Sequence, residues 1–207
     1  MNLQADLLVL LPELILAIGA MALLLAGAIS GEKSAPAISL GAIVLLIAAG
    51  VATVMGPDHV TAFHGAFIAD GFSRFAKILI LIGAALSILL ADEFFSTIHL
   101  SRFELPVLML LATLGMLLMV SSASFLSLYM GLELQSLALY VLAAFNRDHL
   151  RSTEAGLKYF VLGALSSGMM LYGISLIYGF TGSTEFSAIA AVTHAGVPKL
   201  GVVFGIV

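Results

Sequence analysis

One carboxyl group lies in the middle of a long apolar segment. The run from Phe125 to Phe145 reads FLSLYMGLELQSLALYVLAAF, and Glu133 is its only ionisable residue apart from two tyrosines. The flanking charges along the chain are as distant as Glu104 and Arg147. An ionised carboxylate in a bilayer costs several kcal/mol unless it has a partner, water or a proton of its own. The sequence therefore predicts that Glu133 takes part in moving protons or ions.

Further polar groups share a helical face with this carboxyl. Tyr129, Ser136 and Tyr140 follow the spacing i, i+7 and i+11, with Glu133 at i+4, which places all four on one side of a helix. A carboxyl, a hydroxyl and two phenols can hold water or pass protons, so they form a possible proton path. The alternative is a protonated Glu133 that only hydrogen-bonds a neighbouring helix.

Lys158 lies in the next apolar run and is the cation that could pair with Glu133. It also follows Glu154 by four residues, a favourable spacing for a local ion pair. It lies seven residues past Arg151, about 10 Å along a helix, so it could equally extend to the membrane interface. From spacing alone, a pair with Glu133 and a pair with Glu154 both remain open.

The composition is that of an integral membrane protein. Of the 207 residues, 61% are hydrophobic and only 10% charged, against about a quarter charged in soluble domains, and the mean hydropathy is +1.17. The net charge of −4 argues against a nucleic-acid partner. The absence of cysteine excludes disulfides and cysteine-ligated zinc or iron–sulfur clusters within this chain. The five histidines show no metal-ligand spacing on one predicted helix, so we expect no metal site.

The apolar segments predict an all-α, polytopic transmembrane bundle. Six full spans and a partial seventh are expected, at Leu7–Ile29, Ile38–Met55, Phe72–Ala91, Leu105–Val120, Phe125–Phe145, Ala155–Phe180 and from Leu200 onward. The first segment carries Asp6 and Glu13 in place of a basic region, so it is interpreted as a span rather than a signal peptide. The apolar end after Lys199 leads us to expect a longer natural protein.

The connections are short and polar. Residues 56–70 are expected to lie outside the membrane, with Thr61–Phe63 and Ala66–Ile68 forming a hairpin around His64-Gly65. Phe186–Val192 is expected to form a short helix along the membrane surface. Ser121–Ser124 is a tight break between two spans. Close helix contact is expected at the small pairs Gly163/Ser167 and Ala164/Gly168.

Basic residues predict the orientation. Lys33, Arg102, Arg147 and Arg151 lie in the loops 30–37, 92–104 and 146–153, which are therefore expected to be cytoplasmic, with the N-terminus outside. On the other side lie Arg74, Lys77 and Lys199. Arg74 and Lys77 are expected to extend toward the interface at the start of a span.

Two segments are the most specific part of a resemblance that spans essentially the whole chain. They read GLELQSLALYVLAAF and RSTEAGLKYFVLGALSSG. They resemble the proton-translocating, antiporter-like membrane subunits of NADH-quinone oxidoreductase, respiratory complex I, and within that family the subunit N group. The resemblance implies the N-terminal half of an antiporter-like fold: residues 1–104 would hold helices 1–3 with the extramembrane hairpin, and 105–207 helices 4–6 and the start of 7.

The resemblance also implies a function. Glu133 and Lys158 match the acid of the family's fifth helix and the lysine of its sixth, which form an ion pair beside a hydrated half-channel. The chain would then be a membrane-arm subunit that takes part in proton translocation coupled to electron transfer from NADH to quinone.

Several consequences follow for cofactors, partners and location. The subunit would lie in a bacterial inner membrane among other complex I subunits and hold no cofactor, while NADH, flavin, iron–sulfur clusters and quinone would belong to the whole complex. Two alternatives remain open: a subunit of a stand-alone cation/proton antiporter, and a non-translocating scaffold.

Overall fold

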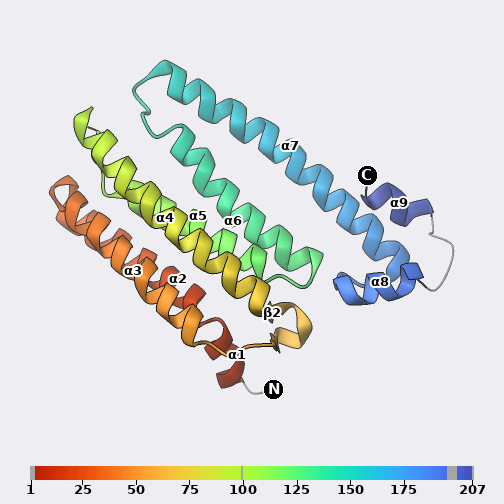
Figure 1. Ribbon diagram of the computed structural model, residues 1–207. Coiled ribbons are helices and arrows are strands. Elements are labelled where there is room, and N and C mark those ends of the chain that lie inside the picture. Colours follow the sequence, from red (N-terminus) through yellow and green to blue (C-terminus); the bar gives the residue numbers. More distant parts are fainter. Residues whose placement is uncertain (1–2, 99, 195–199, 207) are drawn as a thin grey trace.

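The computed structural model describes residues 3–98, 100–194 and 200–206, and almost all of this chain is helical (Figure 1). The long helices between residues 11 and 181 run antiparallel to their neighbours in sequence, and their connections alternate between the two ends of the bundle. The elements follow in the order α1 Leu3–Val9, α2 Leu11–Ser30, the 3₁₀ turn Glu32–Ser34, α3 Ala35–Met55, β1 Val60–Ala62, the 3₁₀ turn Phe63–Gly65, β2 Phe67–Ala69, α4 Gly71–Thr97, α5 Glu104–Val120, α6 Phe125–Ala143, α7 Leu150–Thr181, α8 Phe186–His194 and α9 Leu200–Ile206.

Within the described residues, five helices are long and apolar enough to cross a membrane. They are α2, α3 with its preceding 3₁₀ turn, α4, α6 and α7. Helix α5, the fourth expected span, has 17 residues and a length of about 26 Å, close to the lower limit for a span. The all-α transmembrane class is therefore confirmed, whereas the number of spans in a bilayer stays a prediction.

Three expected boundaries differ from the structure. The first expected span is divided between α1 and α2, because Pro12 has no N–H for the helical ladder and its ring crowds the carbonyl four residues before it. Helix α4 continues to Thr97, past the end expected at Ala91, and α7 already begins at Leu150. Charged residues end an apolar run, but they do not end a helix, since the helical backbone satisfies its own hydrogen bonds.

The central helix of the bundle is α5. It packs against α2, α3, α4 and α6, and its Leu110 and Leu117 are fully buried in the main apolar core. Against α6 the two backbones touch: a Cβ atom built on Gly115 would lie 2.6 Å from the amide nitrogen of Gln135, and one on Gly131 would lie 2.9 Å from the carbonyl oxygen of Gly115. Glycine is required at this crossing because no side chain fits between the helices.

A four-segment β-strip closes one end of the bundle. Strands β1 and β2 pair antiparallel with Ala62 opposite Phe67. The strip continues through a bridge from Phe67 to Ser122, between α5 and α6, and a bridge from Ser124 to Glu185, between α7 and α8. The expected hairpin is thus present, but its turn holds four residues rather than two. Phe63 and Gly65 there have φ of 53° and 90°, and glycine tolerates this left-handed conformation most readily.

The strip leads directly into two helices whose first turns are capped. Asp70 caps α4 by accepting a hydrogen bond from the amide of Ser73, 2.7 Å away, and this bond lowers the pKa of the Asp70 carboxyl below its ordinary value. Ser124 caps α6 by accepting from the amide of Ser127 at 3.1 Å. The helices therefore begin at fixed positions relative to the strip. Lys199 and the other residues of 195–199 lie outside the described residues.

The close α5–α6 crossing gives a stability prediction. Gly115→Ala should lower the free energy of unfolding by about 1–3 kcal/mol, because the added methyl must push two backbones apart. Equilibrium unfolding of the purified protein in mixed micelles, followed by circular dichroism, measures this change. Gly83→Ala in α4 is the matched control. An added methyl there meets no heavy atom within 4 Å, so stability should be unchanged or higher by up to about 1 kcal/mol. Equal effects at both glycines would contradict the packing argument.

Candidate functional site

Glu133 lies on the face of α6 that packs against α7, and it is half-buried. Its carboxylate accepts a hydrogen bond from the hydroxyl of Ser167 in α7. The same hydroxyl lies 2.9 Å from the phenol oxygen of Tyr129. Because serine has one hydroxyl proton and gives it to Glu133, Tyr129 is the donor in the second bond. A continuous chain of hydrogen bonds therefore runs from Tyr129 through Ser167 to Glu133.

Ser167 is the member of this chain whose role the sequence did not predict. Its spacing from Gly163 assigned it to helix packing only. Serine in a membrane helix serves both purposes, since it is small and can hydrogen-bond across an interface. The distinguishing information is which residue of α6 faces it, and that depends on the register of the two helices.

The register of α6 against α7 is set by small residues. A Cβ atom built on Gly156 would lie 2.5 Å from the Cβ of Ala144, and one on Gly163 would collide with the hydroxyl of Tyr140. The two helices therefore run antiparallel with Gly156 level with Ala144 and Gly163 level with Tyr140. This register places Ser167 opposite Glu133, as the hydrogen bond shows.

The structure does not bring Lys158 to Glu133. Lys158 bonds instead to Glu154, with Nζ 2.5 Å from Oε1, and the two side chains are 69% and 55% exposed. By the register above, Lys158 lies level with about residue 142, nine residues beyond Glu133, or about 14 Å along the helix axis. A lysine side chain is too short to cover that distance. Of the two pairings left open by the sequence, the local one is present.

Ser136 and Tyr140 lie on α6 between the levels of Glu133 and Lys158. The ring of Tyr140 packs edge-on against Tyr159 and Phe160 of α7, with centroids 4.8 and 5.7 Å away. Its hydroxyl points to Gly163, where any side chain would displace it. Three of the five residues expected from the sequence, Tyr129, Glu133 and Tyr140, thus contact α7, and Lys158 lies at the more exposed end of the α6–α7 interface.

A second ionisable pair is much more deeply buried, and the sequence missed it. Lys77 of α4 places Nζ 2.7 Å from Oε1 of Glu13 in α2, and the side chains are 4% and 2% exposed. Lys77 was expected to extend to the membrane interface. Instead its side chain points into the bundle, where it forms an ion pair with Glu13. The helix N-terminus next to Glu13 also favours its negative charge. Removing one partner from a buried pair costs about 3–5 kcal/mol, since the other charge is left uncompensated.

Comparisons with known proteins agree with the antiporter-like interpretation. The family described as "NADH:quinone oxidoreductase/Mrp antiporter, TM" matches residues 122–207. NADH-quinone oxidoreductase subunit N 1 of Rhizobium meliloti is 56% identical over 197 residues, which is 95% of this chain and 41% of the relative. Subunit N of Parvibaculum lavamentivorans is 56% identical over 198 residues, again 95% of this chain and 41% of the relative.

A solved structure shows the same fold. A chain of respiratory complex I from Thermus thermophilus with bound aureothin superposes with a TM-score of 0.75 at 31% identity, covering 94% of this chain and 41% of that one. Over 94–95% of its length, this chain is thus similar in sequence and fold to antiporter-like membrane subunits. It spans about two fifths of the length of these relatives, at 41%, and it is a multi-pass protein of the inner membrane.

One of the two polar sites lies inside the region matched by the family, and the other lies outside it. The matched region begins at Ser122, so the Tyr129–Ser167–Glu133 chain and Lys158 lie within the region that the family shares. Glu13 and Lys77 precede it and fall only within the longer match to subunit N relatives. The expected division of the chain into residues 1–104 and 105–207 stays a prediction.

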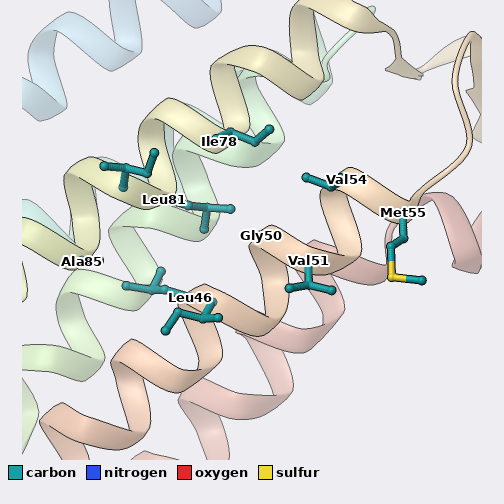
Figure 2. Close-up of a pocket in the computed structure, with 10 residues that line it drawn as sticks. Leu46, Gly50, Val51, Val54, Met55, Ile78, Leu81 and Ala85 are labelled. Atoms are coloured by element: carbon teal, nitrogen blue, oxygen red, sulfur yellow. The ribbon is translucent and has the colours of Figure 1, made fainter.

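The part of the chain described here brings together no group of metal ligands, and the groove between α3 and α4 is apolar. No group of three or more His, Cys, Asp or Glu side chains comes together in residues 3–98, 100–194 and 200–206. A groove of about 420 Å³ lies between α3 and α4, lined among others by Leu46, Val51, Ile78 and Leu81 (Figure 2). Only apolar side chains and a glycine line it, so it offers no group that could bind or pass a proton.

Proposed function

We propose that this chain takes part in proton translocation as a membrane-arm subunit of a NADH-quinone oxidoreductase. The observation that carries the proposal is the Tyr129–Ser167–Glu133 hydrogen-bond chain between two membrane helices of the family's shared domain. A carboxyl group with two hydroxyl groups in series can take up a proton and hand it on. In such a complex, NADH, flavin, iron–sulfur clusters and quinone would act in other subunits, and this chain would contact the neighbouring membrane subunits.

The proposed path runs along the α6–α7 interface. Glu133 holds a proton or a negative charge, Ser136 and Tyr140 line the next part of α6, and Lys158 stands about 14 Å further along, held by Glu154. Release of Lys158 from Glu154 changes the electric field along this line. The electrostatic energy of a charge at Glu133 depends on this field. Electron transfer elsewhere in the complex would drive that release.

A stand-alone cation/proton antiporter is the second function considered for the sequence. It shares the family description, but the relatives with 56% identity are named as NADH-quinone oxidoreductase subunits. A non-translocating scaffold would need neither the buried carboxyl nor its hydroxyl chain. We therefore favour the respiratory complex.

The coupling between Glu133 and its neighbours can be measured by double-mutant cycles in the full-length subunit within the assembled complex. Glu133→Gln should lower quinone reduction and proton translocation together by at least about tenfold, that is, by about 1.4 kcal/mol or more in barrier height. Ser167→Ala should reduce both rates less, and adding it to Glu133→Gln should change nothing further, because contacting residues of one unit are not additive. Ser166→Ala, one position along α7 and exposed, is the matched control and should behave as wild type.

Lys158 enters the same experiment as a separate arm. Residues that are 14 Å apart and share no partner would have additive effects if they acted independently, and the proposed path predicts the opposite for Glu133 and Lys158. A Glu133→Gln/Lys158→Met double variant that is no slower than the slower single variant would show that the two groups act together in the working complex. Additive losses would separate Lys158 from Glu133. Normal turnover and a normal proton-to-electron ratio in assembled Glu133→Gln would remove Glu133 from the mechanism.

The orientation is also a proposal. At the end of the bundle opposite the strip lie Lys33, Arg102, Arg147 and Arg151, whereas the strip end holds Arg74 and the buried Lys77 among the described residues. The positive-inside rule then places the strip and the N-terminus outside the cytoplasm.

Cysteine labelling tests this orientation in intact cells whose outer membrane has been permeabilised. Cysteines introduced at Ser34 and Asp148 should be protected from an impermeant thiol reagent added from outside, while one at His64 should react. Lysed cells provide the control, since all three positions should then react. Labelling of Asp148→Cys in the intact cells would reverse the assignment.

A further inference from the structure

The Glu13–Lys77 pair lies directly beneath the β-strip and contacts it. Lys77 joins α4 to Glu13 of α2 at 2.7 Å, and its Nζ is also 4.9 Å from the centroid of the Phe67 ring in β2. Phe67 is buried with Val9 and Ala62 in a small apolar cluster separate from the main core. One ammonium group therefore connects two membrane helices with the hairpin.

The positive charge of Lys77 attracts the ring of Phe67. The face of a phenyl ring attracts a cation, and the attraction is strongest where water is excluded. An ammonium group can remain charged in such a place only with an anion beside it. Glu13 supplies that anion, so the ion pair keeps a cation against Phe67. An apolar pair of the same volume would fill the space without holding the ring.

The strip carries this connection to the start of α6. The amide of Ile68 donates to the carbonyl of Ser121 at 2.8 Å, and the amide of Ala123 donates to the carbonyl of Ala66 at 3.0 Å. The hydroxyl of Ser127 in α6 also donates to the carbonyl of Ala66, at 3.0 Å. Three hydrogen bonds therefore fix the segment 121–127 to β2 and the residue before it.

The same segment is the entry to the Glu133 site. Tyr129 lies two residues after Ser127 and Glu133 six residues after it, or about 9 Å along α6. From the other side, the amide of Phe125 donates to the carbonyl of Thr184 at 2.9 Å, so the α7–α8 connection is tied to the same point. The position of the hairpin thus bears on both helices that build the Tyr129–Ser167–Glu133 chain.

We propose that Glu13 and Lys77 are a positioning pair that holds the start of α6 in register through Phe67 and β2. The pair holds the hairpin in place through Phe67, and the hairpin holds the segment 121–127 through hydrogen bonds. The position of that segment determines how Tyr129 and Glu133 are placed relative to Ser167. Its effect on proton translocation rests on the proposed function above. Its effect on the position of α6 does not, and the two are measured separately.

The decisive measurement is hydrogen–deuterium exchange of peptides covering residues 121–128 in the assembled complex containing the full-length subunit. The double variant Glu13→Gln/Lys77→Met removes both charges, and it is used because either single change would leave an uncompensated buried charge. Exchange in 121–128 should be at least about tenfold faster than in wild type. Phe67→Leu, which leaves the ion pair intact but removes the ring, should give the same increase. Lys77→Arg, which keeps a cation at this position, should exchange in 121–128 as slowly as wild type.

The matched control is Asp58→Asn. Asp58 forms the exposed ion pair of the same hairpin region with Arg74, 2.7 Å away, so its loss should leave exchange in 121–128 unchanged. Unchanged exchange in the assembled double variant, or in Phe67→Leu, would overturn the proposal. The proton-to-electron ratio is measured on the same samples beside Glu133→Gln. A normal ratio in Glu133→Gln would defeat the proposed function, while the exchange data would still decide whether the pair positions α6.

Discussion

A backbone amide or carbonyl group inside a bilayer has no water to bind, and this constraint accounts for most of the architecture. Each membrane-crossing segment is a helix that satisfies its own hydrogen bonds. Irregular backbone occurs at the ends of the bundle. At one end, β1, β2, the α5–α6 connection and the α7–α8 connection are joined side by side by backbone pairing. The connections at that end therefore form one hydrogen-bonded unit, and a displacement of one strand is passed to its neighbours.

The same low polarity decides where charges can be placed. The described part of the chain holds three ion pairs, and they differ greatly in exposure. Asp58–Arg74 and Glu154–Lys158 are open to the surroundings and contribute little to stability in water. Glu13–Lys77 is almost fully enclosed, so each partner depends on the other to remain charged. Among the described residues no cation is paired with Glu133, whose carboxylate accepts a hydrogen bond from a hydroxyl group instead.

Helix packing then determines which polar groups meet. Glycines at the α5–α6 crossing bring the backbones together, so α6 is held firmly on one side. On its other side, Gly156 and Gly163 fix the register of α7, and that register brings Ser167 rather than Lys158 to Glu133. The Tyr129–Ser167–Glu133 chain and the small residues Gly156 and Gly163 thus belong to the same α6–α7 interface.

The sequence by itself determined the membrane class, the approximate helices and the hairpin, and it singled out Glu133 as a candidate, because apolar run length and a lone charge act locally. Tyr129 was also identified, since helical spacing alone puts it beside Glu133. The break at Leu10, the four-residue turn and the partners of Lys158 and Lys77 were decided only by the tertiary structure. Glu13 and Lys77 are 64 positions apart, and nothing in either local segment reveals that α2 and α4 meet there. Ser167 follows the same rule: its type was visible in the sequence, but the residue it faces depends on how α6 and α7 slide against each other.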